Sequence, residues 1–248
     1  MHKLGETRSV QKQNHMLLTA DTFVRTALPG MKTCTAIVHA GPAMGARFAQ
    51  YTAEFESGGE LGGTRTQRFL YVLAGELKLD VHGRPSRLGT HAYAYLPAGL
   101  AHRVVATKAS RAAVIEKLYQ PISDAQAPGV IISNEDAVIS EPLDGDPGLQ
   151  VKHLLPDTMS FDFAVNTMIY QPGAALGMVE MHVMEHGLLM LEGGGIYRLG
   201  DSWYPVTAGD FIWMGPWCPQ WFGAIGKVQA KYLIYKDWNR HPLAESSR

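Results

Sequence analysis

Short stretches of alternating apolar and polar residues recur along the chain, separated by glycine and proline. In the first half they include residues 49–55, 69–81 with a turn at Gly75, and 92–96. Side chains two positions apart lie on the same face of a strand, so this alternation predicts half-buried β-strands. Several short strands at roughly 8–12-residue spacing are typical of a β-sandwich or a small β-barrel. We therefore predict an all-β fold.

The same pattern returns in the second half in the same order. The segment 191–199 resembles 73–79, and the segment 230–237 resembles 113–119. Self-similarity of this kind indicates an internal duplication, here with copies of about 100 residues. We expect each copy to form its own β-barrel.

The residues between the two copies differ from both, because they include four prolines and the turn sequence Asp-Gly-Asp. Long, proline-rich connections usually join separate units. We therefore expect an N-terminal domain at 1–120, a linker at 121–148 and a C-terminal domain at 149–248. Within the linker, residues 130–132 also fit a strand that pairs with a sheet.

Composition excludes several classes of protein. The 248 residues are 46% hydrophobic and 18% charged, which is enough to bury a sizeable core. The net charge of −1, without long runs of one sign, argues against nucleic acid or an anionic membrane as a partner. No apolar run reaches the roughly 18 residues of a membrane span, and the N-terminus lacks the apolar core of a signal peptide. We expect a cytoplasmic protein with two reduced thiols, Cys34 and Cys218, too few for a cysteine-cluster zinc site.

The strongest chemical signal is Glu180, His182 and His186, which form Glu-x-His-x3-His. Carboxylate and imidazole are donors of the kind that bind divalent transition metals. On one straight strand the two histidines would lie about 13 Å apart, whereas metal–nitrogen bonds are about 2 Å long. We expect Glu180 and His182 to share a strand face and the chain to turn at residues 183–185, inside a barrel.

Two motifs around these residues resemble those of the cupin family. The usual first motif is Gly-x5-His-x-His-x3,4-Glu-x6-Gly. Here Gly173, Glu180, His182, His186 and Gly193 fit it, with one extra residue near the start and Glu and His exchanged at the outer ligand positions.

The usual second motif is Gly-x5-Pro-x-Gly-x2-His. Residues 209–220 fit it, with Gly215 in the proline position, Trp217 in the second glycine position and Gln220 in the ligand position. The resemblance implies a bicupin, that is, two tandem jelly-roll barrels. It also implies one metal site whose ligands are Glu180, His182, His186 and Gln220. Mixed carboxylate, amide and imidazole ligation suits Mn²⁺.

The N-terminal copy lacks this ligand set. Residues 58–69, where its first motif should fall, contain no histidine, and only His102 remains, in the final position of the second motif. We expect this domain to be metal-free and structural.

A closer resemblance covers nearly the whole chain and is strongest in the second half. Segments 180–187, 195–199, 203–206, 209–216 and 232–240 are similar to the (S)-ureidoglycine aminohydrolases, which are bicupin enzymes of purine breakdown. The resemblance implies Mn²⁺-dependent hydrolysis of (S)-ureidoglycine to (S)-ureidoglycolate and ammonia, in allantoin catabolism. The basic stretch Thr-Arg-Thr-Gln-Arg in the first half departs from the family pattern.

The resemblance also implies substrate-binding residues, namely Glu180, Tyr197, Tyr232 and Lys236. Alternation places Tyr232 and Lys236 on one face of a strand. If that face is the barrel interior, Lys236 is the catalytic candidate for proton transfer, because burial near a cation lowers the pKa of a lysine.

Two alternatives remain open at this point. A cupin dioxygenase or isomerase would usually keep three histidines and one glutamate. A non-catalytic, ligand-binding bicupin is the other, although a sensor would normally carry a DNA-binding segment and none is visible. For partners we expect a small-molecule substrate and a homo-oligomer, with no nucleic acid and no membrane.

Overall fold

The computed structural model describes residues 6–240, and they are almost entirely β-strand. They form two compact units. The N-terminal unit is residues 24–138, and the C-terminal unit is residues 6–23 together with 139–240. Three short 3₁₀ turns are the helical elements of the described chain: η1 (Ala20–Thr22), η2 (Pro42–Met44) and η3 (Glu135–Ala137). Within these residues, no helix has the length and apolar character needed to cross a membrane.

The N-terminal unit is one curled antiparallel sheet of ten strands. Their order is β12-β9-β6-β11-β5-β10-β7-β8, with β4 also paired to β5 and β3 to β4. The strands are β3 (Arg25–Thr26), β4 (Met31–Ala40), β5 (Ala49–Leu61), β6 (Gln67–Ala74), β7 (Glu76–Val81), β8 (Arg84–Gly89), β9 (Ala92–Leu96), β10 (His102–Ala106), β11 (Ser110–Lys117) and β12 (Ile131–Asn134).

The turn that the sequence predicted at Gly75 joins β6 to β7. Gly75 has φ +91°, and a Cβ there would lie 2.7 Å from the carbonyl oxygen of Ala109. A left-handed conformation and this close approach both require glycine. The turn therefore sets the start of β7 and with it the register of the following hairpin.

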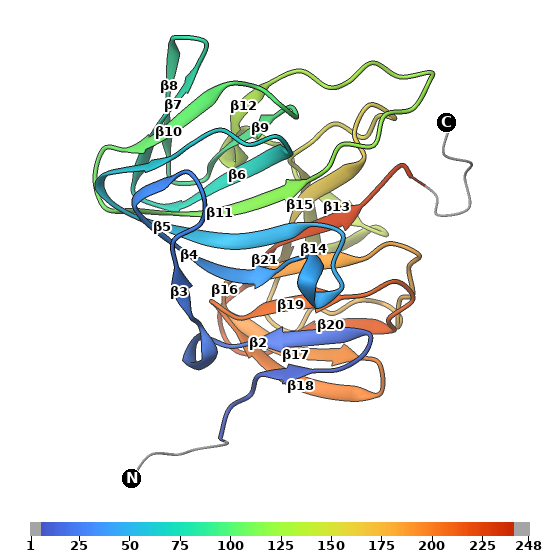
Figure 1. The fold of residues 1–248 in the computed structure, drawn as a ribbon. Helices are drawn as coiled ribbons and strands as arrows, with labels where there is room; N and C mark the ends of the chain where they lie inside the picture. The colour runs from blue at the N-terminus through green and yellow to red at the C-terminus, as the bar shows by residue number, and fades with distance from the viewer. Residues whose placement is uncertain (1–5, 241–248) are drawn as a thin grey trace. The chain divides into compact units, whose positions relative to one another are not determined.

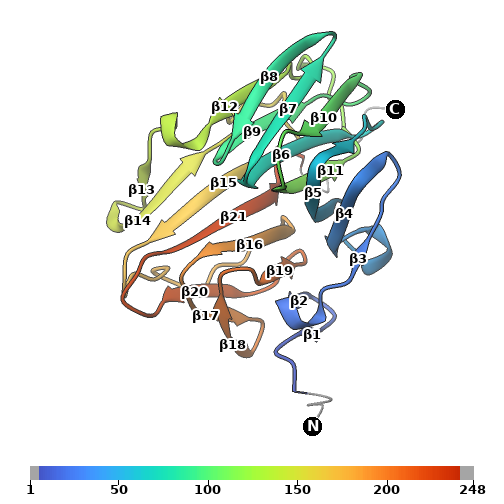
Figure 2. The same cartoon turned by 90° about the vertical axis from the view of Figure 1, so that its left-hand side faces the viewer.

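The C-terminal unit contains two antiparallel sheets, of eight and three strands. Their orders are β1-β2-β19-β16-β21-β15-β14-β13 and β18-β17-β20, and Figure 2 shows β21 between β15 and β16. The strands are β1 (Val10–Gln11), β2 (His15–Leu18), β13 (Glu141–Leu143), β14 (Asp146–His153), β15 (Phe163–Tyr170), β16 (His186–Glu192), β17 (Gly194–Leu199), β18 (Ser202–Thr207), β19 (Phe211–Met214), β20 (Gln220–Ala224) and β21 (Ala230–Asp237).

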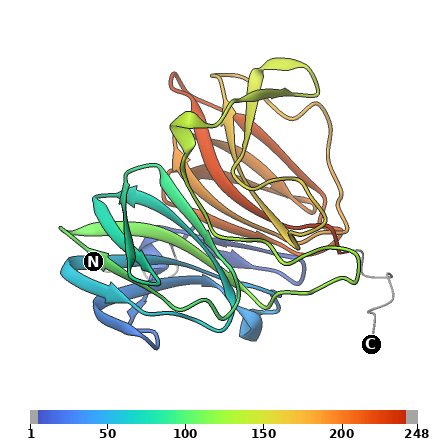
Figure 3. The same cartoon turned by 90° about the horizontal axis from the view of Figure 1, so that it is seen from above.

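The strands of the C-terminal unit curve around a common interior (Figure 3), and buried apolar side chains fill it. Both sheets contribute to it, with Tyr170 and Leu188 from the larger sheet and Phe222 from the smaller one. The Tyr170 and Phe222 rings meet edge to face with centroids 4.8 Å apart, an arrangement that aromatic pairs prefer. Members of this apolar cluster, among them Tyr197 and Tyr232, also line the pocket in which the predicted site residues lie.

The two units have the same strand order. The series β12-β9-β6-β11-β5-β4-β3 corresponds to β2-β19-β16-β21-β15-β14-β13, and β8-β7-β10 corresponds to β18-β17-β20. The prediction of an all-β fold of two tandem barrels from an internal duplication is confirmed.

The division into units differs from the expected domain limits. Residues 6–23 were expected in the N-terminal domain, but β2 pairs with β19 of the C-terminal unit. Figure 1 shows β2 in blue among orange strands. Within the expected linker, β12 pairs with β9 of the N-terminal unit, while β13 pairs with β14 of the C-terminal unit. Local periodicity can indicate that such a segment is a strand, but it cannot identify the barrel that the strand joins.

Candidate active site

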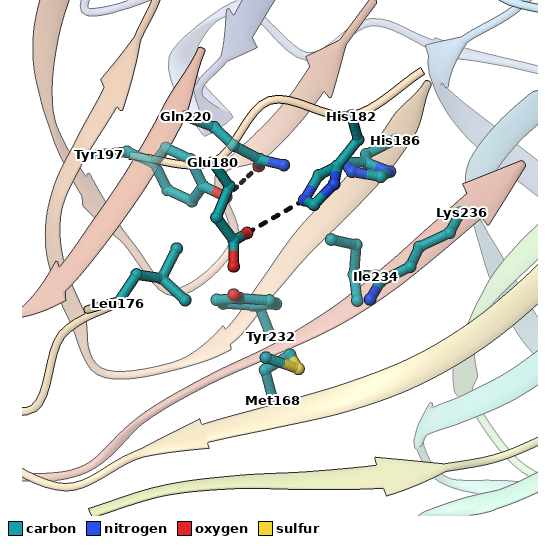
Figure 4. Close-up of a pocket in the computed structure, with 10 residues that line it drawn as sticks. All are labelled: Met168, Leu176, Glu180, His182, His186, Tyr197, Gln220, Tyr232, Ile234 and Lys236. Carbon is teal, nitrogen blue, oxygen red and sulfur yellow. Dashed lines mark hydrogen bonds and ion pairs between the residues drawn. The ribbon is translucent and has the colours of Figure 1, made fainter. Parts of the chain in front are cut away.

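One pocket in the C-terminal barrel brings together all seven side chains that the sequence analysis selected (Figure 4). They lie on the loop before β16 and on β16, β17, β20 and β21, beside three apolar residues. The seven are Glu180, His182, His186, Tyr197, Gln220, Tyr232 and Lys236. As alternation predicted, Tyr232 and Lys236 share the inner face of β21.

The loop before β16 carries two of these side chains. Glu180 and Gln220 exchange backbone hydrogen bonds of 2.8 and 2.9 Å, which attach the loop to the start of β20. The chain then bends at residues 183–184, and His186 begins β16. The predicted turn between the two histidines is confirmed. The expectation that Glu180 and His182 share a strand face was wrong, because this segment is an irregular loop, attached by the Glu180–Gln220 bridge and by a hydrogen bond from Trp217 N–H to the His182 carbonyl oxygen.

The loop residues contact each other. His182 Nε2 donates to Glu180 Oε2 at 3.1 Å, and both side chains are about one-third exposed. The rings of His182 and His186 have centroids 5.3 Å apart. In contrast, His186 and Gln220 are buried. The site therefore has an accessible side on the loop and a fixed side on β16 and β20.

Neighbouring groups orient the two buried donors. His186 Nδ1 donates to the carbonyl oxygen of Glu185 at 2.9 Å, which leaves Nε2 with a free lone pair toward the pocket. The Tyr197 hydroxyl donates to Gln220 Oε1 at 3.0 Å. A carbonyl oxygen has two lone pairs, so Oε1 can still bind a second group. Hydrogen bonds of this kind, which orient a donor side chain, are usual around protein metal ligands.

Burial sets the protonation states of the pocket. It lowers the pKa of His186 well below the ordinary value, with smaller contributions from Lys236 and His182. The imidazole is therefore neutral, as metal binding requires. Burial also lowers the pKa of Lys236, while the Glu180 carboxylate opposes the change. The hydroxyl of Tyr232, which contacts Tyr170 at 2.7 Å, has a pKa well above the ordinary value because it is buried, and it stays protonated.

The chemistry of the donor set fits a divalent metal ion. A carboxylate, two imidazoles and an amide oxygen surround one pocket. Within the described residues, no three His, Cys, Asp or Glu side chains already form a metal-binding group. Glu180 and His182 are instead hydrogen-bonded to each other, and the fourth expected donor, Gln220, is an amide. A cation can replace the proton that this pair shares.

A cavity of about 280 Å³ extends from Glu180, His182 and His186 toward β14 and β15. Its walls include His153, Asn166 and Trp238 in addition to Lys236. The sequence analysis did not select the first three as site residues: His153 and Asn166 belong to no recognised motif, and Trp238 lies in the family-like segment 232–240 without a role assigned to it. Only the strand pairing of β14, β15 and β21 brings them to the site.

The N-terminal unit has a different group at the corresponding place. In the second barrel His186 is paired in register with Lys236, and in the first barrel Arg68 is paired with Glu116. Arg68 is buried, donates to Glu116 Oε1 at 2.6 Å and to His102 Nε2 at 2.8 Å. A guanidinium group therefore lies where the C-terminal unit has an imidazole.

Comparison with known proteins agrees with this architecture. The model of the Cupin domain matches residues 54–116 and 166–235, one stretch in each unit. A solved structure, the putative glyoxylate-induced protein from Pseudomonas aeruginosa, superposes with a TM-score of 0.89 at 29% sequence identity, covering 99% of this chain and 96% of that one.

Two curated relatives carry a more specific description. The probable (S)-ureidoglycine aminohydrolase of Oryza sativa subsp. japonica is 40% identical over 96% of this chain and 78% of its own length. The (S)-ureidoglycine aminohydrolase of Escherichia coli (strain K12) is 32% identical over 96% of this chain and 93% of its own length. The likeness extends over 96% of the chain and therefore includes both barrels, and we conclude that the chain belongs to the (S)-ureidoglycine aminohydrolase family of cupin enzymes.

Proposed function

We propose that this protein hydrolyses (S)-ureidoglycine to (S)-ureidoglycolate and ammonia, with Mn²⁺ held by Glu180, His182, His186 and Gln220. The observation that carries the proposal is the pocket that joins these four donors to the half-buried amine of Lys236. The descriptions of the relatives support the choice of substrate. We further propose that the reaction belongs to allantoin catabolism, in a cytoplasmic homo-oligomer.

The donor set supports manganese because it mixes oxygen with nitrogen and contains no thiolate. When bound, Mn²⁺ would supply open coordination positions and positive charge for the substrate. The central carbon of ureidoglycine carries a carboxylate, an amine and a ureido group. Attachment of the substrate at several points fixes the orientation of its substituents in the pocket, and this selects one enantiomer.

Tyr197 and Tyr232 have protonated hydroxyls at the pocket, because burial raises the pKa of both well above the ordinary value. A protonated hydroxyl can donate a hydrogen bond to an anionic or carbonyl oxygen. We assign both residues to substrate binding, and Tyr197 also orients Gln220.

Lys236 is the proposed proton-transfer residue. Its lowered pKa favours a neutral amine, which can accept a proton from water as the water oxygen bonds to the central carbon. The C–N bond to the amine breaks, and Nζ returns the proton to the departing nitrogen, which leaves as ammonia. One water is consumed, the ureido group is kept, and the lysine ends as it began.

For the N-terminal unit we propose a metal-free, structural role. The guanidinium of Arg68 brings a fixed positive charge to the place that corresponds to the ion in the other barrel, and Glu116 neutralises it. A second cation there would meet electrostatic repulsion and has no free carboxylate to bind.

The test is ammonia release from (S)-ureidoglycine generated enzymatically in the assay. We expect chelation to abolish turnover, Mn²⁺ to restore it, and His186→Ala to remove both metal and activity. His91→Ala, in the N-terminal unit, is the matched control and should behave as the wild type. Turnover by the metal-free protein would refute the metal site, and oxygen consumption would instead favour a dioxygenase.

A further inference from the structure

A buried amide on β15 is unused in the chemistry described above. Asn166 is only 3% exposed, and its Oδ1 has no hydrogen-bond partner among the described residues. An unpaired buried acceptor costs about 1–3 kcal/mol. An unpaired polar group in a protein interior needs an explanation, and the surroundings of Asn166 indicate that its Oδ1 binds a ligand.

The position of Asn166 connects it to the proposed catalytic group. Asn166 is paired in register with Ile234 of β21, and Lys236 is the next residue on the same face of that strand. The two side chains are therefore diagonal cross-strand neighbours. Both line the cavity of about 280 Å³ that also contains Glu180, His182 and His186, three of the four expected metal donors, and both line a smaller adjoining cavity of about 50 Å³.

The chemistry of a carboxamide matches one of the three substituents on the central carbon. The terminal carbamoyl of a ureido group has a carbonyl acceptor and an NH₂ donor side by side, and the Asn166 amide has the same pair. Two antiparallel hydrogen bonds can form, in which Oδ1 accepts from the substrate NH₂ and Nδ2 donates to the substrate oxygen. A carboxylate offers no donor for Oδ1, and an amine offers no acceptor comparable to a carbonyl.

We propose that Asn166 determines specificity for the ureido group, by pairing with its terminal carbamoyl and so placing the central carbon beside Lys236. The inference rests on the proposed function for the identity of the substrate. The inference goes beyond the proposed function because it assigns one substituent of that substrate to a subsite on β15, away from the metal donors. A site built to pair a polar group rejects analogues that lack the group, because its own atoms are then left unsatisfied.

The first measurement is kinetic. Asn166→Leu has similar volume and no hydrogen-bonding groups, and we expect it to lower kcat/KM for (S)-ureidoglycine about 10- to 100-fold. The Mn²⁺ content should stay as in the wild type. The urea concentration at half-unfolding should not fall, because an unpaired buried acceptor is removed. Ile169→Val, on the opposite face of β15, is the matched control and should leave kcat/KM unchanged.

The second measurement separates this subsite from the reaction. Binding of N-carbamoylglycine, which has a ureido group, is compared with binding of glycolate, which has none, by calorimetry on the Mn²⁺-loaded protein. We expect the wild type to prefer N-carbamoylglycine, and Asn166→Leu and the isosteric Asn166→Asp to lose most of that preference.

The outcomes are distinguishable. A wild type that prefers N-carbamoylglycine through Asn166 but releases no ammonia would support the subsite and refute the aminohydrolase. An active enzyme in which either folded variant keeps the wild-type kcat/KM and ligand preference would refute the subsite alone. Absence of any preference in the wild type, or loss of Mn²⁺ in Asn166→Leu, would also overturn the proposal.

Discussion

At Gln220, two neighbours determine what the side chain can do. The backbone bridge to Glu180 fixes the position of the residue at the start of β20, and the Tyr197 hydroxyl fixes the direction of Oε1. An amide is a weak, neutral ligand, so its contribution depends on being held in place before the ion arrives. In this arrangement Tyr197 is a positioning residue for the proposed metal site in addition to its proposed role in substrate binding.

Removal of that hydroxyl tests the positioning role. We expect Tyr197→Phe to weaken Mn²⁺ binding about 10-fold, as is usual when a group that orients a metal ligand is lost. Tyr204→Phe is the matched control, because the Tyr204 hydroxyl contacts His15 instead, at 2.9 Å. The dissociation constant from metal titration is the measurement, and an unchanged value for Tyr197→Phe would show that Gln220 does not need this support.

Lys236 differs from the other polar residues that line the pocket because it carries an amine, and this side chain is half-buried. We expect Lys236→Met to lower kcat by a factor of about 10²–10⁴ with Mn²⁺ content retained, which is the usual effect of losing a proton-transfer group. Exposed Lys227→Met should have wild-type kcat. If Lys236→Met turns over at the wild-type rate, another group moves the proton.

At the scale of elements, β2 is the least expected part of the C-terminal unit. It pairs with β19, which would otherwise be the edge of the sheet, and its Leu17 is fully buried in the apolar interior of that unit. Arg8, just before β1, adds an ion pair to buried Asp210. An uncovered β19 would present unpaired backbone groups, which is the physical reason for an additional strand there.

The stability of the C-terminal unit should therefore depend on residue 17. We expect Leu17→Ala to lower its free energy of unfolding by about 2–5 kcal/mol, the range for a large-to-small change in a core. Urea unfolding followed by tryptophan fluorescence measures it. Leu118→Ala, at a side chain 72% exposed, is the control and should have little effect. Equal midpoints for the two variants would contradict the structural role of β2.

The β4–β5 pair of the N-terminal unit contains a buried histidine with a pH-dependent consequence. His39 Nε2 contacts the Thr52 hydroxyl at 2.8 Å, and burial lowers the pKa of His39 to about 3. An unfolded chain has a histidine pKa of about 6.5. Below that pH, His39 binds a proton in the unfolded state but not in the folded state. The contribution of His39 to the free energy of unfolding is therefore fully present above pH 6.5 and is lost as the pH falls toward 3.

The expected loss from His39 is about 2 kcal/mol at pH 5 relative to pH 7.5. Urea unfolding monitored by circular dichroism at the two pH values measures it, and His39→Gln should reduce the difference by about this amount. A variant with the same pH dependence as the wild type would mean that other groups cause it.

At the scale of the whole molecule, the two barrels share a strand order but have diverged in their interiors. One has Arg68 and Glu116 where the other has His186 and Lys236, so a permanent ion pair corresponds to the proposed metal and catalytic positions. The five tryptophans of the chain are also unevenly distributed between the two units, because all of them lie in the C-terminal unit. Tryptophan fluorescence therefore reports on that unit alone.

Metal binding should accordingly stabilise only one unit. We expect Mn²⁺ at about 100 times its dissociation constant to raise the free energy of unfolding seen by fluorescence by about 2.7 kcal/mol. His186→Ala should abolish the shift. A Mn²⁺-dependent shift that persists in this variant would point to a second metal site and would contradict the metal-free N-terminal unit.

The sequence by itself determined the strands, the duplication and the residues expected at the site, because alternation, turn glycines and motif spacing are local properties. It placed Tyr232 and Lys236 on one face and required a turn before His186, as the structure has it. The tertiary structure decided which barrel receives β2, that Glu180 lies in a bridged loop, and that Asn166 faces the same cavity. These depend on edge hydrogen bonding and burial between residues distant in sequence, which no local pattern records.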